Sequence, residues 1–440
     1  MNGLVMAAQL IFGLAILVTL HELGHFLAAR AFGIRVEKFY LFFDAWGFKF
    51  FKFKRGDTEY GLGWLPLGGY VKISGMIDES MDKEAMKLPP EPWEFRSKPA
   101  WQRLIVMIGG VTMNVLLGIF IYTASLLHYD KEYLANKDVN DGIFAFELAE
   151  KLGLQTGDKI TAINGKPFER FEELLSSKVI FGCDLTVDRA GQTVHVIVPA
   201  DFYFDVTKSG KGFFLSTNQT SLIIDSTVAG KPGAAAGLLK DDKVITVNEK
   251  RTASPDGARK IIKENTGKAV SIVVLRGADT LQFQPLVSDS GIIGVYFKMD
   301  LGKYPMTAYS FGTALSIGTA DAFEAIIGNI KGLKQIFAGK AKASDSLQGP
   351  IGIATIYGSV WDWRWFWKIT GLLSMILAFM NILPIPALDG GHVVFLVIEA
   401  VTKRKFSDKF MERAQVTGMV ILLALMAFTI GNDIWKHVIN

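Results

Sequence analysis

Cysteine is nearly absent from this sequence, with Cys183 the only one among 440 residues. A single cysteine excludes an intramolecular disulfide framework and any zinc or iron–sulfur site built from several thiolates. Charge is also scarce, at 20% of residues against a hydrophobic share of 50%. This composition excludes disorder and is too apolar for an ordinary cytosolic enzyme. The net charge of +4 is mild, so we expect no nucleic-acid partner.

The apolar residues gather in uncharged runs near the two ends of the chain. These runs are residues 1–20, 104–127, 369–388 and 414–431. Each approaches the ~20 residues that a helix needs to cross the hydrocarbon of a bilayer, so the sequence predicts four membrane spans. A signal peptide is the alternative for the first run, but no lysine or arginine precedes Arg30. A buried core helix is the alternative for the third, in which Pro384 and Pro386 predict about three helical turns followed by an extended turn.

Basic residues set the expected orientation of the spans. They are dense in residues 28–103 and again between the third and fourth runs. Loops that carry many lysine and arginine residues next to the spans stay in the cytoplasm. Both termini and residues 128–360 should therefore lie outside. We expect residues 78–92 to form an exposed cytoplasmic loop and residues 397–413 a basic amphipathic helix along the inner membrane face.

The outer region repeats itself. The segment GLQTGDKITAING, which begins at residue 153, recurs 84 residues later as GLLKDDKVITVNE. Each copy is followed by an amphipathic stretch and then by alternating strands, which predicts two copies of a small mixed α/β module. The arrangement resembles a tandem of PDZ domains, which bind extended peptides by strand addition. The alternative is that both modules act only as steric spacers.

A metal-binding motif lies in the first apolar run, as HELGH at residues 21–25. Positions four apart share one face of a helix, so His21 and His25 can bind one Zn²⁺. Glu22, beside the first histidine, can reach water at the metal as general base. The alternative is a pair of histidines hydrogen-bonded within a helix bundle.

A catalytic zinc needs a third protein ligand. The extended motif HExxHxxGxxH would supply a histidine, but residues 28–31 are AARA. The best candidate is Asp389, in NILPIPALDGGH at residues 381–392, with His392 as its rival. An ordinary interfacial turn would also explain an aspartate there. The prolines and glycines of the segment predict unwound backbone, which is tolerated at membrane depth where it lines a cavity.

HExxH in the first run, NxxPxPxLDG in the third and the tandem modules between the second and third resemble the site-2 protease family of intramembrane zinc proteases. The bacterial sigma-E regulator protease is the branch that the chain resembles most. Three shorter segments also fit, namely FRSKPAWQR at 95–103, GPIGIA at 349–354 and Asn432 with Asp433. The resemblance implies a membrane α-helical core of four spans, a re-entrant β-hairpin and an extracytoplasmic tandem of α/β PDZ-like domains.

The resulting division of the chain has six parts. They are a first span with HExxH and hairpin at 1–100, a second span at 101–128, PDZ-like domains at 129–207 and 208–300, a membrane-proximal linker helix at 301–360, and the last two spans at 361–440.

The resemblance also implies a function. It implies a zinc-dependent intramembrane endopeptidase of the bacterial inner membrane, with its active site toward the cytoplasm. Its partners would be the bilayer and single-span membrane proteins, such as anti-sigma factors or remnant signal peptides, already cut by an upstream site-1 protease. His21, His25 and Asp389 would hold Zn²⁺, Glu22 would be the base, and Asn381 would contact the substrate backbone.

Aromatic and basic residues largely alternate in FKFFKFK at residues 48–54, and Gly56 and Asp57 supply a turn. Residues 59–73 would form a second extended arm. The resemblance implies a re-entrant β element whose edge pairs with the unwound substrate, with Gly61, Gly63, Pro384 and Pro386 at the substrate. A lipid-anchoring hairpin is the alternative. The first arm holds more aromatic and lysine residues than the family suggests, so substrate selection stays open.

The rival class of function is a membrane-tethered peptide-binding adaptor with a structural zinc. Structural zinc sites are closed by four protein ligands, whereas catalytic sites keep one position open. Three plausible ligands therefore favour catalysis.

Overall fold

The computed structural model describes residues 2–66, 68–76, 89–209, 214–340, 342, 344, 347–404 and 406–436. The chain forms two compact units. The first combines Met1–Lys131 with Tyr309–Asn440, and the second is Glu132–Ala308. Most of the loop expected at 78–92 lies outside the described residues.

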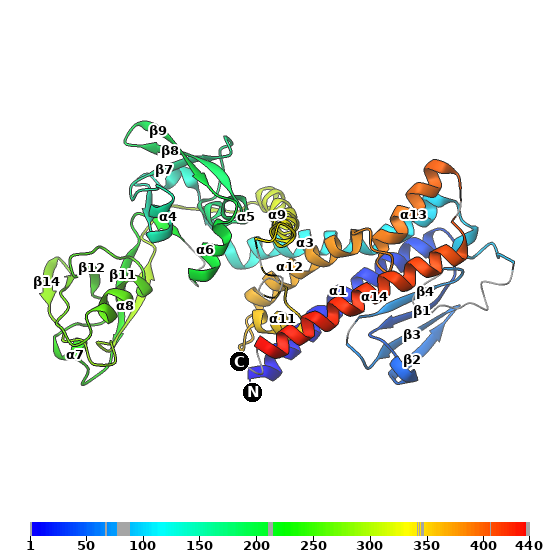
Figure 1. Ribbon diagram of the computed structural model, residues 1–440, viewed down its shortest axis with the longest axis horizontal. Coiled ribbons are helices and arrows are strands. Elements are labelled where there is room, and N and C mark those ends of the chain that lie inside the picture. Colours follow the sequence, from blue (N-terminus) through cyan, green and yellow to red (C-terminus); the bar gives the residue numbers. More distant parts are fainter. Residues whose placement is uncertain are drawn as a thin grey trace. The chain divides into compact units, whose positions relative to one another are not determined.

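Within the described part of the chain, four helices of the first unit are long and apolar enough to cross a membrane, as the four uncharged runs predict. Figure 1 shows the sheet of this unit next to α1, which contacts β1 and β4. The four helices are α1 (Asn2–Ala31), α3 (Ala100–Ser125), α12 (Trp363–Ile382) and α14 (Asp408–Ile434). The same unit contains α9 (Phe311–Phe337), α11 (Pro350–Tyr357) and α13 (Asp389–Thr402).

Two helical predictions need correction. The third span is longer than about three turns, because α12 begins at Trp363, where the Asp362 side chain accepts the backbone N–H groups of Arg364 and Trp365. It does end at Ile382, before the first proline. Residues 397–413 do not form one amphipathic helix: α13 ends at Thr402, Lys403 takes a left-handed conformation, and α14 begins at Asp408.

Glycines set the distance between α1 and α3. A Cβ atom added at Gly24 would lie 2.2 Å from the carbonyl oxygen of Gly109, and one added at Gly109 would lie 2.6 Å from that of Gly24. The two backbones therefore touch one turn away from His21. This close approach brings the histidine face of α1 directly onto α3.

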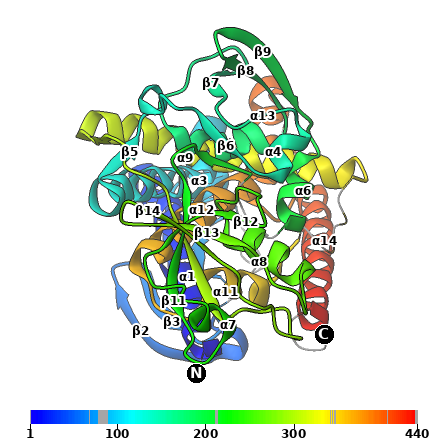
Figure 2. The ribbon, with the colours of Figure 1, turned by 90° about the vertical axis from the view of Figure 1, so that its left-hand side faces the viewer.

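A four-stranded sheet follows α1 in the first unit. The hairpin β2–β3 forms as the alternating pattern predicts, but the second arm divides into β3 and β4, and β1 was not predicted. The strands are β1 (Val36–Leu41), β2 (Lys49–Arg55), β3 (Thr58–Gly63) and β4 (Tyr70–Ile73). Their order is β2-β3-β1-β4, so β2 and β4 are the edges, and Figure 2 shows β2 on the outside of this unit. The pair β1–β3 is parallel and the other pairs are antiparallel.

The described residues of the second unit form two hydrophobic cores, one within residues 134–215 and one within residues 222–297. Phe214 and Leu215 pack in the first core, which therefore extends past residue 207. The strands around the first core are β5 (Glu132–Leu134), β6 (Ile143–Ala145), β7 (Lys159–Ile163), β8 (Cys183–Arg189), β9 (Gln192–Val198) and β10 (Leu215–Thr217), with helices α4 (Glu147–Lys151), α5 (Ser177–Ile180) and α6 (Phe202–Ser209).

The second core lies under a five-stranded sheet of order β14-β13-β12-β11-β15. Its strands are β11 (Ser221–Thr227), β12 (Lys243–Val247), β13 (Ile272–Arg276), β14 (Asp279–Phe283) and β15 (Val295–Asp300), and its helices are α7 (Pro232–Ala235) and α8 (Pro255–Glu264). The short strand β16 (Met306–Ala308) returns to pair with β5.

The sequence repeat is also a repeat of contacts. Asp158 is buried and accepts hydrogen bonds from Arg189, which also donates to the carbonyl of Gly153. In the second copy, Asp242 is paired with Arg276 in the same way, and Arg276 donates to the carbonyl of Gly237. The aspartate shared by both repeats therefore joins the turn before one strand to the next strand of its sheet.

Candidate metal centre and active site

The two histidines of HELGH lie on one face of α1 and are almost fully buried. The ring nitrogens Nε2 of His21 and His25 are 3.3 Å apart, and the rings are nearly perpendicular. Helical spacing brings both nitrogens to the same point, as the sequence predicts.

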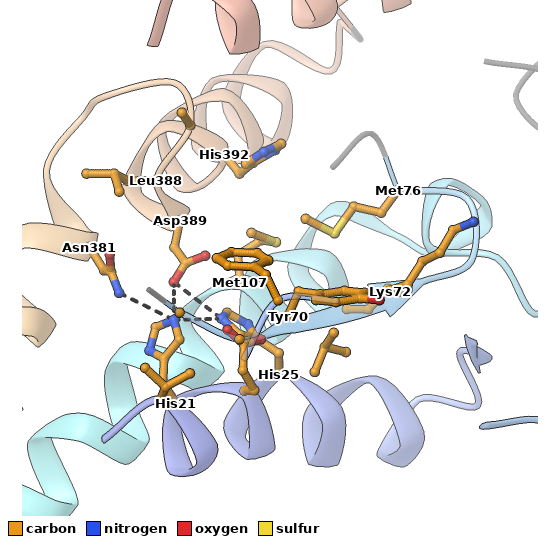
Figure 3. A pocket seen from close by; sticks show the side chains of 18 of the residues that line it. His21, His25, Tyr70, Lys72, Met76, Met107, Asn381, Leu388, Asp389 and His392 are labelled. Carbon is orange, nitrogen blue, oxygen red and sulfur yellow. Dashed lines mark hydrogen bonds and ion pairs between the residues drawn. The ribbon is translucent and has the colours of Figure 1, made fainter. Parts of the chain in front are cut away.

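Asp389 reaches this point from the other end of the chain. It is the first residue of α13, after the turn that follows α12. The turn packs tightly on the new helix, because a Cβ atom at Gly390 would lie 2.3 Å from the carbonyl oxygen of Leu383. The Oδ2 atom of Asp389 lies 3.3 Å from Nε2 of His21 and 3.3 Å from Nε2 of His25 (Figure 3).

The three atoms form an equilateral triangle that fits a tetrahedral zinc ion. Ligand atoms about 2.0–2.1 Å from a tetrahedral Zn²⁺ are separated by about 3.3–3.4 Å. The Oδ2 atom of Asp389 is buried and has no hydrogen-bond partner. Within the described residues, His21, His25 and Asp389 form the cluster whose ligand atoms converge closely enough to hold a metal. The donor set is typical of zinc.

His25 is oriented by a contact behind its ring. Its Nδ1 atom lies 2.8 Å from the carbonyl oxygen of Val106 on α3. A carbonyl only accepts, so Nδ1 carries the proton and Nε2 keeps its lone pair for a metal.

Gly110 on α3 leaves room for the metal-facing atoms. A Cβ atom there would lie 2.4 Å from Nε2 of His25 and 2.6 Å from Cε1 of His21. Any side chain at this position would enter the space where the two imidazoles converge.

The triangle opens into a cavity of about 670 Å³ in the first unit. Its walls come from α1, α12, α13 and the edge strand β4 with the residues just before it. Glu22 lies in this wall, and its carboxylate faces the backbone N–H of Val71 on β4. A base and an edge strand of the described sheet therefore meet beside the triangle. The lining includes Val18, Lys38, Gly68, Gly69, Tyr70, Lys72, Met76, Met107, Asn381, Leu388, His392 and Gln415.

Asn381 and His392 both line the cavity. Asn381 lies at the end of α12, with Nδ2 3.3 Å from Nε2 of His21. His392 lies beyond Asp389, and Figure 3 shows its ring away from the point where the other three side chains meet. The geometry therefore favours Asp389 over His392 as the third ligand.

The other residues expected at the substrate lie elsewhere. Gly61 and Gly63 are on β3, an inner strand with both edges paired, and they do not line the described cavity. Their missing side chains make room for neighbours: a Cβ atom at Gly61 would lie 2.3 Å from the ring of Tyr40, and one at Gly63 would lie 2.3 Å from the backbone of Phe43.

Pro384 and Pro386 shape the turn before Asp389 but are also absent from the described lining. Gly68 and Gly69 take the place expected for Gly61 and Gly63. The sequence feature that could have identified Gly68 and Gly69 is a glycine pair directly before β4, the last strand of the second arm.

Comparisons with known proteins agree with this geometry. The model of Peptidase family M50 matches residues 9–425. The chain belongs to Peptidase family M50. It is 29% identical to a protein of Vibrio cholerae provisionally named zinc metalloprotease, with 96% of this chain and 97% of that protein covered. It is also 29% identical to the regulator of sigma E protease of Haemophilus influenzae, again with 96% and 97% covered.

The M50 peptidase is thus a zinc metalloprotease, as its motifs predict, and its four apolar helices make it a multi-pass membrane protein. A non-enzymatic adaptor with a structural zinc is not supported.

Proposed function

We propose that this M50 peptidase cleaves single-span membrane proteins within the bilayer of the bacterial inner membrane, with zinc held by His21, His25 and Asp389. The convergence of these three side chains at 3.3 Å, with both histidines on a helix long and apolar enough to span, carries the proposal. Ionisable groups at membrane depth are costly and are retained where they do chemistry.

Each site residue has one role in this proposal. Zinc, when bound, would supply a Lewis acid that polarises the scissile carbonyl and lowers the pKa of a water molecule, so that this water gives up a proton more readily. The Glu22 carboxylate takes the proton from that water and passes it to the leaving amine. The Asn381 amide, next to His21, donates to the substrate backbone.

The substrate has to be extended at the cut, because an α-helix hides its peptide bonds in its own hydrogen bonds. The edge strand β4 pairs with β1 on one side, and its residues line the cavity. A substrate segment would add to the other side of β4, as peptides add to exposed sheet edges elsewhere. This replaces the role first expected for the glycines of β3.

We assign the second unit the role of an outer filter. Its two modules would be PDZ-like, lie on the extracytoplasmic side and keep proteins with bulky ectodomains from the cavity. Substrates such as anti-sigma factors or remnant signal peptides would then enter after an upstream protease has removed the ectodomain. The name of the Haemophilus influenzae relative supports the anti-sigma-factor class.

The test is cleavage of a single-span protein by the purified enzyme in lipid vesicles. Glu22→Gln should keep its zinc and its fold but lose cleavage by orders of magnitude, because the base is gone while the ligands remain. His195→Gln is a matched control, since this exposed histidine lies in the second unit. Cleavage by Glu22→Gln at a near-normal rate would remove Glu22 from the mechanism.

A further inference from the structure

His21 has a polar partner behind its ring, as His25 does. Its Nδ1 atom lies 3.1 Å from the side-chain amide nitrogen of Asn114 on α3. Asn114 is completely buried, at 0% exposure. It follows Gly110 by one helical turn, so both residues present the same face of α3 to the histidines.

An Asn114 amide that turns its N–H group toward Nδ1 conflicts with metal binding at Nε2 of His21. An N–H group of Asn114 that donates to Nδ1 requires a lone pair on Nδ1, and the neutral ring then carries its proton on Nε2. Nε2 is, however, the atom that faces His25 and Asp389. A protonated Nε2 cannot bind zinc.

The unused atom of Asn114 resolves the conflict. Its Oδ1 atom is buried and has no hydrogen-bond partner. The two ends of an asparagine amide are nearly indistinguishable in shape, so a half-turn about the Cβ–Cγ bond exchanges oxygen for nitrogen at the same place. The oxygen then accepts the Nδ1–H group of His21, which would otherwise be a buried donor facing an amide N–H.

We propose that Asn114 is a positioning residue that accepts a hydrogen bond from Nδ1 of His21 and thereby fixes the tautomer that presents Nε2 to zinc. It does for His21 what the Val106 carbonyl does for His25. The inference rests on the ligand set of the proposed function. Partners of this kind raise the affinity of a histidine for its metal about 10- to 100-fold.

Two substitutions separate this role from simple packing. Asn114→Leu keeps the approximate volume and removes the acceptor, so zinc affinity, measured in graded chelator buffers, should fall about 10- to 100-fold. Asn114→Asp keeps an acceptor and cannot donate when ionised, so it should retain zinc close to wild type. Equal losses in both variants would overturn the proposal, and so would an Asn114→Leu protein that holds zinc like wild type.

Two controls address the helix itself. Ser374→Ala removes the hydrogen bond that Ser374 donates to the backbone carbonyl of Asn114, without touching the amide. Thr112→Val changes an exposed residue on the same helix. Both should bind zinc like wild type, and a Ser374→Ala loss as large as that of Asn114→Leu would show that helix packing is the cause.

The protonated nitrogen of His21 can also be identified directly, without any variant at Asn114. Nitrogen-15 NMR of histidine-labelled, zinc-loaded enzyme distinguishes a protonated Nδ1 from a protonated Nε2, and the signal of His21 is assigned by its absence from His21→Gln. The proposal predicts Nδ1–H for His21, and Nε2–H would contradict it. If His21→Gln keeps its zinc, the ligand set itself is wrong. If it loses zinc while Asn114→Leu does not, only the role of Asn114 fails.

Discussion

The amide nitrogen of Asn381 lies 3.3 Å from Nε2 of His21, the ring atom that faces the other two candidate ligands. Once Nε2 of His21 is bound to a metal, the Asn381 amide is free to donate to a carbonyl oxygen beside it. Asn381 can therefore stabilise the negative charge that develops on the scissile carbonyl.

Asn381→Ala should accordingly keep its zinc and lose catalysis. Removal of one such donor costs about 10²- to 10³-fold in rate, so kcat/KM for a membrane substrate should fall by about that factor. Zinc content per molecule, measured on the same preparation, separates the two roles. A loss of zinc in proportion to the loss of activity would place Asn381 among the metal-holding residues instead.

Gly110→Ala should abolish zinc binding without unfolding α3. The added methyl group would lie 2.4 Å from Nε2 of His25, whereas alanine favours a helix over glycine by about 1 kcal/mol. Gly431→Ala is the matched control, because nothing lies within 4 Å of a Cβ atom at that helical position. Zinc content is the measurement, and full zinc occupancy in Gly110→Ala would contradict the observed packing.

The four spans could be predicted because the length of an apolar run is a local property of the sequence. Asp389 could be predicted because HELGH lacks a third ligand and the turn at 381–392 has the composition of a cavity lining. Strand β4 could not be placed, since its pairing with β1 joins segments that are not adjacent in sequence. The inner position of Gly61 and Gly63 could not be predicted for the same reason: composition does not tell an inner strand from an edge strand.

The arginines of the two modules were missed for a different reason. Asp158 and Arg189 are 31 residues apart, whereas Asp242 and Arg276 are 34 apart. The repeat of 84 residues is therefore out of register at the arginines, although the contacts are the same.

The ion pair of Asp242 and Arg276 predicts that the second core loses stability in acid. Burial alone raises the pKa of Asp242, but hydrogen bonds from Arg276 and from the backbone N–H of Leu239 outweigh it and lower the pKa. A lowered pKa stabilises the folded state above the ordinary aspartate value of about 3.9, and the contribution is lost as the pH falls through the lowered pKa.

The second core of Asp242→Asn should therefore have a lower free energy of unfolding than that of wild type at pH 7. The difference between the two free energies should become smaller below about pH 3.9. Hydrogen exchange of β12 and β13 in the full chain measures it. Asp241→Asn is the neighbouring control, because the Asp241 side chain is 70% exposed. A stability difference that does not change with pH would contradict the role of the ion pair.

The second unit should be removable without loss of the active site. The backbone N–H of Tyr309 donates to the carbonyl of Lys131 at 2.9 Å, so the two ends of the insertion are neighbours. Replacement of residues 132–308 by a short glycine linker should leave a zinc-loaded enzyme that also cleaves substrates with intact ectodomains.

The same deletion combined with Glu22→Gln shows whether any cleavage comes from this site. If the shortened, zinc-loaded enzyme discriminates between intact and trimmed substrates as the full chain does, the second unit is not the filter.

The third ligand is the part of the account on which the rest depends, and metal content tests it directly. Asp389→Ala leaves two neutral imidazoles, so zinc per molecule after purification and mild chelation should fall sharply. Asp389→Asn should lose less, because an amide oxygen can still coordinate weakly. His392→Ala should retain zinc. An Asp389→Ala protein that holds zinc like wild type, beside a His392→Ala protein that does not, would contradict the account and move the third ligand to His392.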